Sequence, residues 1–187
     1  MKILCFTKYL DININLNNYL KTGVKLKMDK ILNILKENSN LSYGEIAAMI
    51  NEPEDYVEKQ IKQYEQDGII RGYRAVIDYD KVKDAGATAF IELKVTPKKD
   101  TGFDEIAKQV MAFEEVENVY LMAGSFDLMV RVNGENVTEI AMFVAKRLST
   151  LDGVLATNTH FQLRTYKESG IIIFDEEDQE DKRSIIL

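Results

Sequence analysis

A glycine and a carboxylate stand three positions apart in the segment GSFD, where Gly124 is first and Asp127 is last. The segment separates two stretches of strand-like residues, so it is predicted to be the turn of a hairpin. A carboxylate suits an ammonium group, and a glycine lets backbone groups approach a ligand closely. A purely structural alternative is that Gly124 permits the turn and Asp127 bonds its own backbone.

A second chemically capable stretch runs from Asn51 to Tyr73. Its apolar residues recur at helical spacing, with Asn51 predicted as the N-cap and Gly68 as the stop. The candidates for contact with DNA lie on this helix, at the start of the helix before it and on the strand after it: Ser42, Tyr43, Lys59, Lys62, Gln63, Arg71 and Arg74. Alternatively, these lysines are ordinary solvated helix surface, with Glu58 and Lys62 paired.

The charge of this region opposes DNA binding. Residues 28–79 contain ten acidic residues against six lysines and arginines. Neutralisation of phosphates by basic side chains supplies most non-specific affinity for DNA. A single copy is therefore expected to bind DNA weakly, and several copies on one oligomer would raise the affinity.

The composition excludes several classes of site. The formal net charge is −7, and the chain has one cysteine, Cys5, and one histidine, His160. No disulfide framework and no multi-histidine metal site is expected, and no cofactor is predicted. No membrane span or secretory signal is recognisable, which makes the cytoplasm the expected compartment.

The first elements predicted are three helices. Apolar residues after Asp29 indicate one helix, and Ser42 with Glu45 forms a capping box that begins the next. The third is the Asn51 helix, and alternating apolar residues from Ile69 to Ile77 predict a strand after it. Residues 28–79 are thus predicted to form a winged helix-turn-helix, with residues 80–86 as a hinge.

Residues 87–170 carry the pattern of a βαββαβ, ferredoxin-like domain, so the fold class is α+β. The expected elements are strands at 87–95, 116–123, 127–132 and 154–166, and helices near 103–111 and 136–151. Leu128, Val130 and Val132 should face the helices, which leaves Asp127, Met129 and Arg131 on the uncovered face of the sheet. A protein partner is expected to cover that face.

The two ends of the chain lie outside these domains. Residues 1–27 are either a poorly ordered arm or the product of an over-extended reading frame whose true start is Met28. Residues 171–187 form a tail whose acidic block should be solvated.

The order of these elements resembles the Lrp/AsnC family of feast/famine transcriptional regulators. The resemblance is carried by LSYGEIAAMI, by the spacing of Val57 to Ile70, by GYRAVIDYDKV, by YLMAGSFDLMVRV and by GVLATNTHFQLRTYK. It implies a DNA-binding domain that acts on promoters, followed by an ACT-like or RAM domain. Gln60 and Tyr64 depart from the family, which usually has arginine and leucine there.

The resemblance also implies an effector, usually an amino acid, bound between C-terminal domains of homodimers that commonly form octamers. The matching positions are Met122, Gly124, Ser125, Asp127 and Thr159. Thr159 could instead be only a good strand former, and His160 is expected to be a surface or interface side chain.

Two other functions remain open on the sequence. An amino-acid sensor or hetero-oligomerising partner could have lost strong DNA binding, since the reading helix is acidic. Siroheme decarboxylases share the architecture but rely on histidine and arginine, and this chain offers only His160. The expectation is a regulator and not an enzyme.

Overall fold

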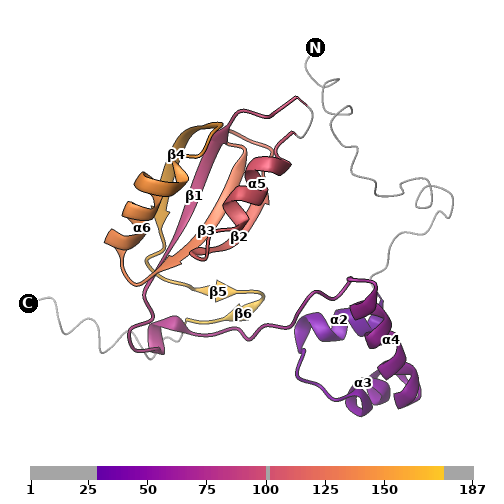
Figure 1. The fold of residues 1–187 in the computed structure, drawn as a ribbon. Helices are drawn as coiled ribbons and strands as arrows, with labels where there is room; N and C mark the ends of the chain where they lie inside the picture. Colours follow the sequence, from indigo (N-terminus) through magenta and orange to yellow (C-terminus); the bar gives the residue numbers. More distant parts are fainter. Residues whose placement is uncertain (1–28, 100–101, 175–187) are drawn as a thin grey trace, which may run out of the picture. The chain divides into compact units, whose positions relative to one another are not determined.

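The structure, a computed structural model, describes residues 29–99 and 102–174. The chain divides into two compact units after Val76 (Figure 1). The first unit contains helices α2 (Lys30–Glu37), α3 (Tyr43–Ile50) and α4 (Glu54–Gln66). The second contains a four-stranded sheet with helices, so the expected α+β class is confirmed.

The helical unit is held together by a small apolar core. Its buried residues come from all three helices: Ile31, Ile46, Ala47, Val57 and Ile61. Ile46 and Val57 are completely buried, which fixes α4 against α3 by its inward stripe. The opposite face of α4 is left to solvent.

The ends of α3 show one confirmed prediction and one error. The capping box of Ser42 and Glu45 is present. Asn51, however, is the C-cap of α3 and not the N-cap of α4, because it adopts the left-handed conformation (φ 58°, ψ 49°) that asparagine tolerates. Pro53 takes the N-cap position of α4 and makes no side-chain cap bond.

The predicted wing strand is wrong. Residues 69–78 have no regular secondary structure, and the described part of the helical unit contains no strand. The backbone N–H groups of Ile69 and Ile70 both donate to the Tyr64 carbonyl, so they finish α4. A strand is stable only when another strand pairs with it. In this chain Ile69, Tyr73 and Ile77 are exposed instead.

The second unit has the predicted βαββαβ order. It contains β1 (Ala87–Val95), α5 (Asp104–Met111), β2 (Val116–Leu121), β3 (Leu128–Gly134), α6 (Val137–Phe143) and β4 (Val154–Phe161). The strands pair antiparallel in the order β2-β3-β1-β4. The two helices cover one face of the sheet, as Figure 1 shows.

The sheet buries one face, as alternation predicts. Leu128, Val130 and Val132 are buried against the helices, whereas Met129 and Arg131 point to the other side. We call this other side the open face. It also carries alternate residues of β1, among them Phe90 and Glu92.

Gly86 ends the segment that leads into this sheet. Its φ is +79°, and a Cβ added there would lie 2.4 Å from the carbonyl oxygen of Gly134. Only glycine fits this close approach of two backbones. The segment before it contains the short 3₁₀ helix η2 (Tyr79–Lys81).

Two later elements differ from prediction. The helix expected to reach Leu151 ends at Leu148. Its α-helical part, α6, ends at Phe143, and the last turn is the π-helical segment η3 (Val144–Leu148). The last strand ends at Phe161, which pairs with Ala89, and not at Tyr166. One backbone bond follows, from the N–H of Gln162 to the carbonyl of Thr88 near the start of β1. A short hairpin follows, with strands β5 (Lys167–Glu168) and β6 (Ile171–Ile172).

The predictions for residues 1–27 and for the acidic part of the tail beyond 174 lie outside the described residues. No helix among the described residues is long and apolar enough to cross a membrane.

Candidate DNA-binding and effector sites

Ser42 and Tyr43 lie where the chain enters α3. The Ser42 hydroxyl donates to Glu45 Oε2 at 2.7 Å, and its backbone N–H reaches the same oxygen at 2.7 Å. These bonds lower the pKa of the Glu45 carboxyl. Ser42 is therefore committed to the helix end, while Tyr43 is 36% exposed and accessible to a ligand.

The two candidate lysines of α4 each face an acidic residue one turn earlier. Lys59 Nζ lies 3.3 Å from Asp55 Oδ2, and Lys62 Nζ lies 2.6 Å from Glu58 Oε1. The hydrogen bond to Glu58 raises the pKa of Lys62. All four side chains are on the exposed side of the helix, so any phosphate that approaches competes with a carboxylate.

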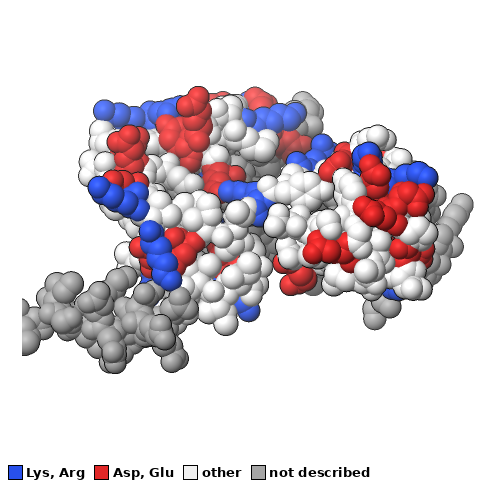
Figure 2. Space-filling view, turned by 90° about the horizontal axis from the view of Figure 1, so that it is seen from below, with Lys and Arg blue, Asp and Glu red and all other residues white. Residues whose placement is uncertain are grey.

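The remaining DNA-contact candidates surround the end of α4. Gln63 Nε2 donates to Asp67 Oδ1 at 2.8 Å. The guanidinium of Arg71 folds over Gly68, and Arg74 is exposed. In Figure 2 acidic and basic side chains alternate over the visible surface.

Tyr73, which the sequence did not single out, holds this segment to the helix. Its hydroxyl donates to Glu65 Oε1 at 2.9 Å. Although Tyr73 is about half exposed, partial desolvation, the hydrogen bond to Glu65 and the negative charge of Glu65 together raise the pKa of Tyr73 to about 12. The sequence carried no signal for this bond, because eight residues separate the partners and no regular element spans them.

The structure brings Ser125 and Asp127 together in the turn between β2 and β3. Asp127 Oδ2 accepts the backbone N–H of Val95 at 2.9 Å, and the backbone N–H of Asp127 donates to Leu93. Lys94 closes the same corner, with its Nζ 3.2 Å from the Ser125 carbonyl and 3.8 Å from Asp127 Oδ2. Lys94 was missed as a site residue; it lies on the open face of β1, two residues after Glu92.

Gly124 has space around it. Among the described residues nothing lies within 4 Å of a Cβ added there, and its φ is not in the left-handed region. Neither the turn nor neighbouring atoms therefore demand glycine at this position. The adjoining Met122 is 42% exposed, and its N–H donates to the Asp127 carbonyl.

Thr159 does not join this group within one chain. It pairs with Ile91, and directly paired residues share a face, so Thr159 lies on the helix side of β4. His160 lies on the open face, where its Nε2 is 3.3 Å from Glu92 Oε1 and 3.0 Å from Asn158 Nδ2.

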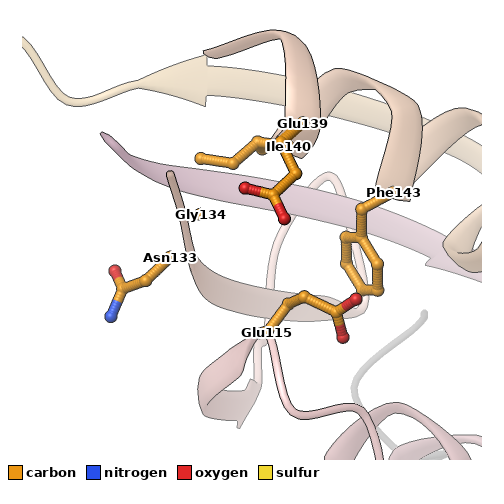
Figure 3. Close-up of a pocket in the computed structure, with 6 residues that line it drawn as sticks. All are labelled: Glu115, Asn133, Gly134, Glu139, Ile140 and Phe143. Carbon is orange, nitrogen blue, oxygen red and sulfur yellow. The ribbon is translucent and has the colours of Figure 1, made fainter. Parts of the chain in front are cut away.

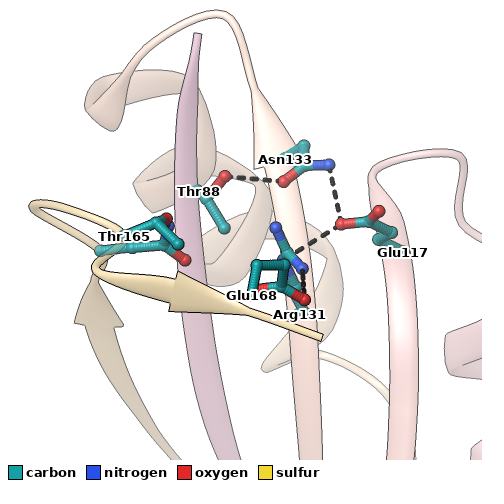
Figure 4. Close-up of polar contacts among 7 residues, drawn as sticks. Thr88, Glu117, Arg131, Asn133, Thr165 and Glu168 are labelled. Carbon is teal, nitrogen blue, oxygen red and sulfur yellow. Dashed lines mark hydrogen bonds and ion pairs between the residues drawn. The ribbon is translucent and has the colours of Figure 1, made fainter. Parts of the chain in front are cut away.

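The open face carries a polar network. Thr88 donates to Asn133 at 2.9 Å, Asn133 donates to Glu117 at 3.2 Å, and Arg131 Nε lies 3.1 Å from the same Glu117 oxygen (Figure 4). Arg131 also stacks over Phe90 and lies 4.0 Å from Glu168 of the terminal hairpin. The network thus joins β1, β2, β3 and β5 on one side of the sheet.

A small pocket at the C-terminal end of β3 was not predicted. Figure 3 shows its lining residues: Glu115, Asn133, Gly134, Glu139, Ile140 and Phe143. Glu115 pairs with Arg147 through Oε1, whereas its buried Oε2 has no hydrogen-bond partner among the described residues. Glu139 accepts the N–H of Glu135 at 2.5 Å. No group of metal-ligating side chains occurs among the described residues.

Family models match both units. Residues 30–71 match a winged helix-turn-helix DNA-binding model, and residues 88–172 match the Lrp/AsnC ligand binding domain.

Individual relatives agree with these matches. The chain is 44% identical to the uncharacterized HTH-type transcriptional regulator YugG of Bacillus subtilis (strain 168), over 86% of this chain and 96% of that protein. It is 35% identical to the uncharacterized HTH-type transcriptional regulator PF1734 of Pyrococcus furiosus, over 74% and 90%. Among solved structures, the transcriptional regulator NMB0573/L-Met complex from Neisseria meningitidis is 27% identical with a TM-score of 0.61, over 74% of this chain and 89% of that one.

Proposed function

The chain belongs to the Lrp/AsnC family of HTH-type transcriptional regulators, and we propose that it binds promoter DNA through α3 and α4 in response to a small effector held at the β2–β3 turn. The effector is an amino acid or a closely similar molecule. The observation that carries the proposal is the corner formed by Lys94, Ser125 and Asp127 beside a glycine that the fold itself does not require.

The chemistry of this corner suits an amino acid. The Asp127 carboxylate can hold an ammonium group, and the Lys94 ammonium can hold a carboxylate. The two groups lie 3.8 Å apart at the surface, so an amino acid would replace one weak ion pair by two. The absence of a side chain at Gly124 leaves room for the ligand to approach the backbone.

The open face supports a homodimer, with higher oligomers such as an octamer built from it. Its apolar side chains include Phe90, Met129 and the half-exposed Tyr120. A second sheet packed on this face would remove them from water. Several helical units on one oligomer would then act together on DNA, which compensates for weak binding by each.

A thermal-shift experiment with the full chain and each of the twenty amino acids tests the effector. One amino acid or a small related group should raise the Tm by several degrees, because a ligand at a hundred times its Kd adds about 2.7 kcal/mol to the stability of the folded state. If all twenty leave the Tm unchanged, the proposed class of effector is wrong.

Two glycine variants locate the effector site. Gly124→Val should leave the Tm of the free protein near that of the wild type and abolish the shift, because space exists for the side chain in the free chain. Gly72→Val, which also has no atom within 4 Å of the added Cβ among the described residues, is the matched control and should keep the shift. If the amino acid raises the Tm of Gly124→Val as it does that of the wild type, the effector does not bind at the β2–β3 turn.

DNA binding is tested by gel shift at low salt, with the DNA that lies upstream of the gene for this protein. Binding should weaken as salt rises, with a slope that reports the number of phosphates contacted. The alternative function, an effector-binding partner of a basic homologue, is favoured by the carboxylates paired with Lys59 and Lys62. Under that alternative the thermal shift persists, no upstream fragment is retarded, and mixed oligomers form with the homologue.

A further inference from the structure

The outward face of α4 consists of acid–lysine pairs and not of a basic strip. Val57 and Ile61 point into the core, so Asp55, Lys59 and Lys62 occupy the opposite side of the helix. The side chains of Asp55 and Lys59 are 71% and 76% exposed, and the ion pair between them is 3.3 Å long. These pairs are what α4 can present to a groove.

The other acidic residues of α4 are turned elsewhere. Glu54 lies against α3, where its Oε2 would be 3.4 Å from a Cβ on Gly44. Glu65 accepts the Tyr73 hydroxyl. Asp55 and Glu58 are thus the carboxylates that accompany lysines on the outward face, and each holds its lysine one helical turn away.

A carboxylate in the major groove distinguishes among bases. Cytosine presents its N4 amino group, which donates to a carboxylate. Thymine presents an acceptor and a methyl group, and adenine sets the N7 acceptor beside its amino group, so both oppose a carboxylate electrostatically. Lysine has the complementary preference, because guanine presents the two acceptors O6 and N7.

An i, i+4 pair places its two groups about 5–6 Å apart at their Cβ atoms, which allows both to reach one base pair or two neighbouring ones. The N-terminal residues of a recognition helix are the ones that contact base edges. Asp55 belongs to the first turn of α4. A recognition helix of this composition gains little affinity from contacts with phosphates and must obtain its affinity from contacts with bases.

We propose that the Asp55–Lys59 pair reads G·C base pairs, with the carboxylate on a cytosine amino group and the ammonium on guanine. The inference rests on the proposed DNA-binding function and names the sequence class of its operator. The Glu58–Lys62 pair repeats the arrangement one turn along the helix edge.

The experiment selects duplexes from a randomised pool with the full chain at low salt. The wild type should enrich cytosine at one position of each half-site. Asp55→Asn should change that position to adenine, since an amide bonds adenine at N6 and N7, and should weaken binding to the cytosine duplex about tenfold. Asp55→Glu keeps the carboxylate and should keep cytosine.

Glu52→Gln is the matched control, because it removes the same charge from an exposed residue that precedes α4. It should leave the selected base unchanged. If Asp55→Asn and Glu52→Gln strengthen binding to all duplexes alike, Asp55 acts only by repelling phosphates and the inference is overturned. If the wild type retains no duplex at all, DNA binding by α4 itself is refuted.

Discussion

Asp127 is bonded to the backbone of Val95, with its Oδ2 2.9 Å from the Val95 nitrogen. The bond ties the β2–β3 turn to the end of β1, and 21% of the Asp127 side chain remains exposed. One carboxylate therefore has two possible tasks, to hold the turn and to receive an ammonium group.

The two tasks separate in two variants of Asp127. Asp127→Ala should lower the free energy of unfolding by about 1–2 kcal/mol, because the Val95 N–H loses its partner. Asp127→Asn keeps an oxygen acceptor and should cost less than half of that, yet lose the thermal shift by an amino acid. Urea denaturation and thermal shift on the same preparations measure both. If Asp127→Asn keeps the thermal shift, the negative charge of Asp127 is not needed to bind the amino acid.

Ser42→Ala should destabilise the helical unit by about 1 kcal/mol, the usual cost of losing an N-cap. The variant should also change the dependence of stability on pH. The pKa of Glu45 is lowered from 4.5 by Ser42, so its contribution is complete above pH 4.5 and is lost as the pH falls through the lower folded value. Denaturation curves at several acidic pH values give the free energy of unfolding as a function of pH. That free energy should fall less steeply with decreasing pH in Ser42→Ala than in the wild type.

Gly86→Ala should unfold the C-terminal unit more easily. The left-handed φ of +79° and the 2.4 Å approach to the Gly134 carbonyl both oppose a side chain, with an expected cost of at least about 2 kcal/mol. Gly72→Ala meets no atom within 4 Å among the described residues and serves as the control. Equal stabilities for the two variants would contradict the close packing of Gly86.

Tyr73→Phe should remove a contribution to the free energy of unfolding that the wild type loses only at strongly alkaline pH. Because the pKa of Tyr73 rises from 10.0 to about 12 on folding, the contribution is complete below pH 10 and is lost as the pH passes 12. Absorbance of tyrosinate during a pH titration should show a late component in the wild type, to which Tyr64 also contributes because burial raises its pKa. The part of that component that titrates near pH 12 should be lost in Tyr73→Phe, and the segment after α4 should exchange its amide hydrogens faster.

Much of the fold was predictable because its periodicities are clear. The alternation of Ala87 to Val95 predicted the bounds of β1, and the alternation from Leu128 to Val132 predicted the face that the sheet buries. The Ser42 capping box is local in sequence and was predicted for the same reason. The βαββαβ order of the elements along the chain was predicted from the same patterns.

The errors arose where a local pattern needs a distant partner. Alternation in residues 69–78 predicted a strand, but pairing decides whether a strand forms, and the described chain supplies none. Asn51 is a good N-cap by type, yet the tight turn after α3 requires a left-handed residue at that position. Lys94 could be placed on the open face, but its contact with Ser125 depends on how β1 and the turn meet.

The segment after β4 also holds the segment before β1. Arg164 Nε lies 3.6 Å from Asp80 in η2, and the same guanidinium stacks on Phe174 and Tyr166. During synthesis Asp80 leaves the ribosome more than eighty residues before Arg164. The junction that leads to the helical unit therefore receives this anchor last, after every strand of the sheet has been translated. A chain truncated after Phe161 would keep all four sheet strands and lose this anchor.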